Sequence, residues 1–271
     1  MRPVAKRSGL LLAVLAIAGC APALRQPPAI YEMAAQRGTR SPEEVGDLLA
    51  RAEELFSRRD LKAARQATEV FLDAAAADPA RIEGLVGAAR AGVWLTEHDP
   101  DPASRGRAAM EAVGAAQWCE RIAAASAVCA YWLGAALGVQ AREWPSTVVS
   151  ALPKIRDAFE RAARGAPTLE EGGPDRALAL FYLRAPGWPS GPGDPELGLE
   201  HARKAVVLSP EYPPNLLALA EALRAAGDRA GARRAIETAL EMARRGATPR
   251  DPDAPEWIRE AERLQGELPA E

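Results

Sequence analysis

The chain has 271 residues, 48% of them hydrophobic, and 34 basic side chains stand against 37 acidic ones, for a formal net charge of −3. This slightly acidic balance argues against a nucleic-acid-binding protein, which would carry a strongly basic face. Six Trp, four Tyr and four Phe are the whole aromatic content. The core must therefore be built mainly from small side chains, above all Ala, between closely packed helices, and the composition predicts an all-α protein.

The first twenty residues have the pattern of a lipoprotein signal. A basic segment is followed by an apolar run over 9–17 that is too short to span a bilayer permanently. Small residues then precede Cys20. An ordinary secretory signal with a chance cysteine is the alternative, but the residues before Cys20 favour lipoprotein processing, with removal of 1–19 and a lipid on Cys20.

Residues 20–40 contain Pro and Gln with little periodicity, so we expect them to form a lipidated tether. Ala21, rather than Asp, follows the lipidated cysteine, which favours the outer membrane over the inner one. The expected location is therefore the periplasmic face of a bacterial outer membrane. The lipid would be the protein's attachment to that membrane.

Periodic sequence begins at Ser41, where Ser41-Pro42-Glu43-Glu44 combines an N-cap, a Pro at the first helical position and a Glu at the third. From there we expect five helix pairs and a last helix that acts as a solubilising cap. The expected helices span 42–57, 61–78, 80–97, 102–124, 126–142, 152–164, 174–183, 195–208, 213–226, 228–245 and 254–268. No alternating run is long enough for a sheet.

The spacing of small residues in these pairs is typical of stacked helical repeats. With Pro210 at position 32 of a 34-residue unit, Ala202 and Ala205 fall at positions 24 and 27. In the following unit Ala232 and Ala239 fall at positions 20 and 27. The pattern predicts one tetratricopeptide-like helical-repeat solenoid over 41–271, with longer loops in its middle units.

One loop has a composition that a simple connection between two helices would not need. The residues after Arg184, up to Asp194, hold three Pro, three Gly and Trp188, so this loop between two helices is built to keep a shape. The segments Phe181–Asp194 and Pro210–Leu223 and, more weakly, Ala130–Gly134 resemble the T-component lipoprotein of tripartite ATP-independent periplasmic (TRAP) transporters. The resemblance covers roughly the C-terminal half of the chain.

That resemblance implies a partner and a mode of action. The T-component would associate with the periplasmic solute-binding protein of the transporter and would form a homo-oligomer, a trimer, with an internal channel. A small apolar or organic-acid ligand would pass through that channel, so the mechanism would be docking and hand-over of solute.

The same match supplies most of the candidate binding residues. Arg184, Trp188 and Asp194 match the family's loop, with Tyr182 and Asn215 beside them. Trp188 either has a binding role, in which its loop lines a ligand path or docks a partner, or plugs the end of the fourth helix pair. Two further aromatic residues, Tyr131 and Trp144, are candidates because they could reach a groove or central opening.

The residues offer no catalytic machinery, so we expect no catalytic residue, cofactor or metal site. His98 and His201 lie in different units without a partner motif, and we expect both on solvated faces. The glycine-containing runs before Asp175 and Asp194 lack the Lys-Ser/Thr of a phosphate loop, so these two aspartates are interpreted as helix caps.

Two cysteines remain besides Cys20. Cys119 and Cys129 form an even pair at the expected junction of two helices, and the expected compartment is oxidising. We therefore predict a disulfide between them. Two small buried thiols in an Ala-rich core are the alternative.

Two functions remain open at this point. The first is an accessory lipoprotein of a TRAP-type transport system. The second is a tetratricopeptide-like scaffold lipoprotein that organises envelope or outer-membrane assembly complexes. A closed apolar cavity would favour the first, and an open polar groove would favour the second.

Overall fold

The computed structural model describes residues 41–246 and 252–268. In these ranges the chain forms α-helices and one short 3-10 helix, and no strand is present there. The predicted signal peptide, Cys20 and the tether lie outside the described residues. Each helix of the described ranges is too short or too polar to cross a membrane.

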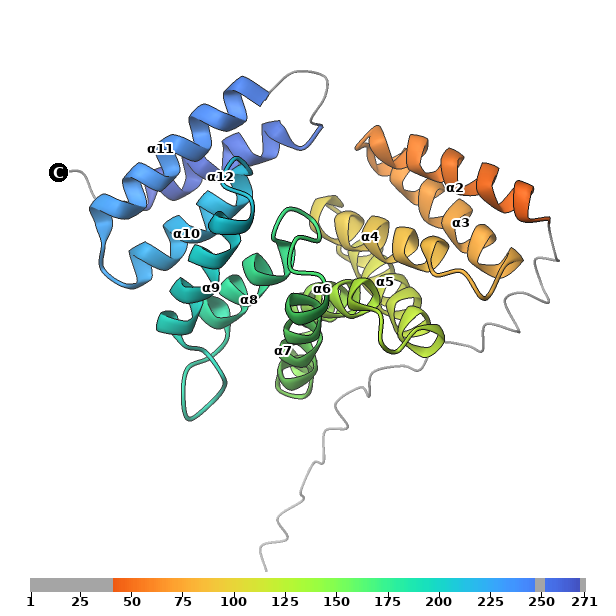
Figure 1. The fold of residues 1–271 in the computed structure, drawn as a ribbon, viewed down its shortest axis with the longest axis horizontal. Coiled ribbons are helices and arrows are strands. Elements are labelled where there is room, and N and C mark those ends of the chain that lie inside the picture. Colours follow the sequence, from red (N-terminus) through yellow and green to blue (C-terminus); the bar gives the residue numbers. More distant parts are fainter. Residues whose placement is uncertain (1–40, 247–251, 269–271) are drawn as a thin grey trace, which may run out of the picture.

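Consecutive helices form antiparallel pairs, and the pairs follow one another along a curved path (Figure 1). The pairs are α2 (Pro42–Ser57) with α3 (Leu61–Ala77), α4 (Glu83–His98) with α5 (Pro102–Ile122), α6 (Ala127–Glu143) with α7 (Val148–Gly165), α8 (Gly173–Arg184) with α9 (Pro195–Leu208) and α10 (Pro213–Ala225) with α11 (Arg229–Gly246). The final helix is α12 (Ala254–Gly266). The first helices of neighbouring pairs also touch, α2 with α4, α4 with α6 and α8 with α10. This is the all-α repeat solenoid that the periodicity predicts.

Local chemistry explains where the helices start. Ser41 accepts a hydrogen bond from the Glu44 N–H while the Glu44 carboxylate accepts one from the Ser41 N–H, which is a complete capping box. Asp60, Asp101 and Ser126 each accept a backbone N–H at the start of the helix that follows them. The capping side chains satisfy N–H groups that the first turn leaves without partners.

The start of α7 differs from its prediction. The expected helix begins near residue 152, yet α7 begins at Val148, after a 3-10 turn at Pro145–Thr147, and continues through Pro153. Because Pro153 lies in the second turn, its ring removes one backbone hydrogen bond and only the first turn must adapt to it. The predicted start is therefore wrong by one turn, since no side-chain cap marks the start at Val148.

The core is made of small side chains, as the composition predicts. One apolar cluster runs through α2 to α8, and a second one joins α10, α11 and α12 through residues such as Leu216, Ile236 and Leu264. Between these two clusters lies a small contact of three buried alanines, Ala179, Ala202 and Ala222, with a fringe of leucines. The described residues thus form two large apolar cores that are packed separately, and a smaller cluster of Val45, Ala74 and Ala77 joins α2 to α3.

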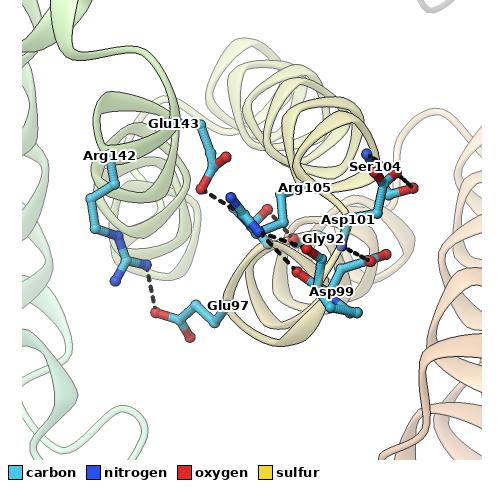
Figure 2. Close-up of polar contacts among 10 residues, drawn as sticks. Gly92, Glu97, Asp99, Asp101, Ser104, Arg105, Arg142 and Glu143 are labelled. Atoms are coloured by element: carbon cyan, nitrogen blue, oxygen red, sulfur yellow. Dashed lines mark hydrogen bonds and ion pairs between the residues drawn. The ribbon is translucent and has the colours of Figure 1, made fainter.

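The turn between α4 and α5 is fixed by charged side chains (Figure 2). Arg65 of α3 pairs with the buried carboxylate of Asp99. Arg105 of α5 donates to the carbonyl of Asp99 and, through Nε, to Glu143 of α6 at 3.0 Å. A second link joins Arg142 of α6 to Glu97 of α4 at 2.8 Å. These bonds hold three consecutive pairs in register.

The two remaining cysteines lie where α5 ends and α6 begins. Cys119 and Cys129 are both buried, their Cα atoms are 5.3 Å apart, and the structure joins them in a disulfide across the turn. The predicted pairing is therefore present. It ties the second helix pair to the third.

Candidate functional site

The first helices of the pairs and α12 surround a groove of about 810 Å³ on the inner side of the curve, here called the inner groove. Its aromatic lining is Phe56, Trp94, Tyr131, Trp132, Tyr212 and Trp257. Its charged lining is Arg59, Arg90, Arg176, Arg184, Arg259, Arg263, Glu97, Glu170, Glu221, Asp253, Glu256 and Glu260. Side chains from residues 56 to 263 thus meet at one site.

Aromatic rings and arginines build the N-terminal wall of the inner groove. The Arg59 guanidinium lies 4.2 Å from the centre of the Phe56 ring, and that of Arg90 lies 5.0 Å from it. Trp94 packs edge-on against Phe56 and stacks on His98 with ring centres 4.1 Å apart. Because residues 90, 94 and 98 are spaced by four, α4 presents all three side chains to the groove.

The floor is organised by Arg176 of α8. Its Nη1 donates to the Asn215 Oδ1 at 2.8 Å and to the carbonyls of Glu170 and Glu171. The guanidinium also lies 5.1 Å from the centre of the Tyr212 ring. Burial raises the pKa of Tyr212 to about 12, so its hydroxyl stays protonated at neutral pH.

The turn that supplies those carbonyls is unusual. Glu170, Glu171 and Gly172 have φ angles of 48°, 55° and 78°, all in the left-handed region. At Gly172 a Cβ atom would lie 3.1 Å from the Ala205 carbonyl oxygen, so glycine suits both the conformation and the space. Arg176 collects the carbonyls that this turn leaves pointing inward.

Ion pairs line the C-terminal wall. Arg184 of α8 pairs with Glu221 of α10 at 2.6 Å, and Arg263 of α12 pairs with Glu260 at 2.6 Å. The hydrogen bond from Arg263 lowers the pKa of Glu260, which therefore stays ionised at neutral pH. Glu260 consequently keeps its cationic partner, Arg263.

The two ends of the solenoid meet across the groove. Arg59, after α2, donates from Nε and Nη2 to the two carboxylate oxygens of Asp253, at 2.7 and 3.0 Å. His98 Nε2 lies 2.8 Å from the Glu256 carboxylate, and its Nδ1 lies 2.7 Å from the Trp94 carbonyl oxygen. The last helix thus does more than cover the end of the repeat, because it closes the groove on the first two pairs.

The charges of the groove are largely neutralised in place. Within the described lining, each arginine except Arg259 has a carboxylate or carbonyl partner. The surface on offer therefore combines aromatic faces with paired charges, which suits an amphiphilic ligand or a partner segment better than a strongly charged one. Among the described residues no group of three or more His, Cys, Asp or Glu could hold a metal ion.

Of the predicted binding residues, two line the inner groove, Tyr131 and Arg184. Trp144 does not, contrary to expectation: its half-buried ring covers Gly106 of α5 at the end of α6. Tyr182 is buried and stacks on His201, with ring centres 5.7 Å apart. The expected cluster is therefore spread over several places.

Asn215 is a structural residue and not part of an accessible surface. It is fully buried, and its Nδ2 lies within 3.0 Å of the carbonyl oxygens of Glu171, Ala205 and Ser209. It joins the turn before α8 to the turn before α10. The same motif that pointed to binding therefore contains residues that hold two repeats together.

Trp188 has the opposite environment. It is 90% exposed, which contradicts the interpretation that it plugs the fourth pair. Its loop is ordered by backbone bonds, from the Gly193 N–H to the Pro186 carbonyl at 2.8 Å and from the Asp194 N–H to the Tyr182 carbonyl at 2.9 Å. At Gly193 a Cβ atom would lie 2.2 Å from the Ala185 carbonyl oxygen, so only glycine fits there.

Three smaller expectations have clear outcomes. Asp194 is the N-cap of α9, as predicted, and accepts from the N–H groups of Glu196 and Leu197. Asp175 is not a cap: it is buried, and its carboxylate lies 2.7 Å from Nδ1 of His201. Neither His98 nor His201 lies on a solvated face, since each is half-buried against an acidic partner.

Comparison with known proteins agrees with this architecture. No protein-family model matches the chain, and no curated protein matches it in sequence. A thermophilic tetratricopeptide protein of Thermus thermophilus, TTC0263, superposes with a TM-score of 0.59 at 18% identity, over 80% of this chain and 98% of that one. The fold is a tetratricopeptide-like helical repeat.

Two other solved structures are more distant. MamA from Desulfovibrio magneticus RS-1 gives a TM-score of 0.46 at 18% identity, covering 73% of this chain and 98% of its own. Yeast Tom70 gives 0.30 at 12% identity, covering 89% of this chain and 70% of its own. The fold assignment rests on the Thermus thermophilus structure, and at 18% identity that similarity describes the fold alone.

Proposed function

We propose that this protein is a non-enzymatic, lipid-anchored accessory component of a TRAP-type transport system, facing the periplasm. In this proposal it docks the periplasmic solute-binding protein, and the inner groove receives a small organic ligand during hand-over. The tetratricopeptide-like fold supports the docking role, because such repeats present surfaces rather than reaction centres.

The observation that carries the proposal is the ordered loop around Trp188. A tryptophan that is 90% exposed contributes little to its own fold, whereas a large rigid aromatic is the side chain that most often anchors an interface. The loop is held at both ends, by bonds to the carbonyls of Tyr182 and Pro186, so the ring can bind a partner with little loss of backbone entropy.

Trp188→Ala is expected to weaken capture of the solute-binding protein by at least about tenfold, as the loss of an interface anchor does. The melting temperature should be unchanged, since the ring is exposed. Val207→Ala, which removes another apolar side chain that is 81% exposed, is the matched control and should capture normally. Normal capture by folded Trp188→Ala protein would exclude this loop as the docking surface.

Membrane attachment is expected to depend on Cys20 alone. Cys20→Ser should release the processed protein into the soluble periplasmic fraction with its fold intact, because the anchor in this proposal is covalent lipid. Fractionation of cells followed by circular dichroism of the released protein checks both statements. Retention of the processed variant in the membrane fraction would contradict the proposed anchor.

A scaffold for envelope or outer-membrane assembly complexes is the second candidate, and the paired charges of the inner groove favour it. Ion pairs such as Arg184–Glu221 and Arg59–Asp253 offer polar recognition to a protein segment. Purification of the lipidated protein from its own membranes separates the two candidates. Recovery of a solute-binding protein supports the transport role, and recovery of assembly factors without one supports the scaffold.

A further inference from the structure

The two apolar cores of the solenoid are connected unequally on its two sides. On the outer side the small alanine contact of Ala179, Ala202 and Ala222 joins them, and Asn215 ties α10 to the turn before α8. On the groove side, at the far ends of the chain, the connection consists of side-chain ion pairs between α12 and the first two pairs.

Those ion pairs are individually modest. The side chains of Arg59 and Asp253 are 23% and 29% exposed, and those of His98 and Glu256 are 21% and 46% exposed. Pairs with such access to water contribute little net free energy, because each charge is well solvated when the pair is broken. No apolar cluster spans this junction in the described residues, since α12 buries Ala261 and Leu264 in its own core with α10 and α11.

We propose that the protein is a clamp, in which the α10–α12 body swings about the contact of α10 with α8 and α9, and the pairs Arg59–Asp253 and His98–Glu256 latch it closed over the inner groove. The structure holds the closed arrangement. Breaking the latch leaves both cores intact and opens the groove between the first two pairs and α12. The inference concerns movement of the chain, so it stands whether or not the proposed transport role is correct.

One of the latch pairs responds to pH. Burial lowers the pKa of His98, but hydrogen bonds to Glu256 and to the Trp94 carbonyl outweigh it, and the pKa of His98 lies above its ordinary value. Glu97 of the same helix adds to this effect, although it also pairs with Arg142 of α6. The other charges at the junction are those of Arg59 and Asp253, which offset one another, and Arg259, which shares the groove lining.

The direction of the pH dependence of closure follows from the raised pKa of His98. The contribution of the His98–Glu256 pair to closure is complete below about pH 6.5, the ordinary value for histidine, and is lost as the pH rises through the higher value of the closed form. Closure should therefore be stronger at pH 5.5 than at pH 8.

Distance measurement between two nitroxide spin labels tests the clamp. The labels are placed at Ser57→Cys, at the end of α2, and at Gln265→Cys, in α12, both exposed positions. The whole mature chain is used with Cys20→Ser, so that only the introduced cysteines react. At pH 5.5 we expect one short distance, and at pH 8 an additional longer one.

The Arg59→Gln, His98→Gln double variant should raise the open population about fivefold, the size expected from loss of two partly exposed ion pairs, and should abolish its pH dependence. Arg58→Gln is the matched control, because the neighbouring Arg58 pairs with Glu54 of its own helix and not with α12, and it should behave as the parent.

Exchanging the two charges of the Arg59–Asp253 pair distinguishes opening of the clamp from unfolding of the protein. Arg59→Asp should open the clamp, and the combination with Asp253→Arg should close it again. If the double variant keeps the parent's distances at both pH values, or if the exchange fails to restore the short distance in a folded protein, the clamp is wrong.

Discussion

Asn215→Ala is expected to lower the free energy of unfolding by roughly 2–4 kcal/mol, the cost of leaving several buried polar groups without partners. The change removes the N–H donors that serve the carbonyls of Glu171, Ala205 and Ser209 and the acceptor that serves Arg176. Neither water nor another side chain reaches this site easily, because Asn215 has no exposed surface. Urea or thermal unfolding followed by circular dichroism measures the loss.

Asn215→Asp distinguishes the contribution of the amide N–H donors to stability from that of the amide oxygen acceptor. The carboxylate still accepts from Arg176, but it places a negative charge among three carbonyl oxygens. We expect it to destabilise at least as much as Asn215→Ala. Ser209→Ala removes only an exposed hydroxyl that donates to Glu171, and it should change stability by less than about 0.5 kcal/mol. A stability for Asn215→Ala equal to that of the parent would remove Asn215 from its role as the link between repeats.

The second large effect concerns the disulfide. Reduction of Cys119–Cys129 is expected to cost about 2–3 kcal/mol, the chain-entropy value for a bridge between residues ten positions apart. The reduced protein keeps both sulfur atoms, so it isolates the effect of the bond. Cys119→Ala with Cys129→Ala should cost more, because both sites are buried and the sulfur volume is lost as well.

Thermal unfolding with and without reductant measures this difference. Counting thiols on denatured, unreduced mature protein provides the independent check. Two alkylatable cysteines besides Cys20, together with a melting temperature that reductant leaves unchanged, would show that the pair is two buried thiols instead.

The helices were predictable because their start signals are local. A capping box at Ser41, an aspartate before α3 and prolines in first turns act over three or four residues, so the sequence displays them directly. The start of α7 shows the limit of such signals. The predicted helix began near residue 152, whereas α7 begins one turn earlier, at Val148, with no side-chain cap to mark it.

The inner groove was only partly predictable, because it depends on contacts between distant residues. His98 and Glu256 are 158 residues apart, and Arg59 and Asp253 are 194 apart, so no motif joins them. The four-residue spacing of Arg90, Trp94 and His98 places these side chains on one face of α4. This spacing could have indicated the N-terminal wall of the groove, but nothing in the sequence distinguished that face from the other faces of the helix. The Trp188 motif was visible, but its sequence could not show which of its residues are buried supports and which is exposed.

The contact between the ends of the chain also has a consequence for how the protein unfolds. In an open array of repeats the terminal helices fray independently, since each repeat touches only its neighbours. Here α12 is held to the first pair through Arg59 and Asp253, so loss of either end removes a partner from the other. Amide exchange at the α2–α3 turn and at the start of α12 should consequently rise together, as it does in a ring whose first and last segments share one opening event.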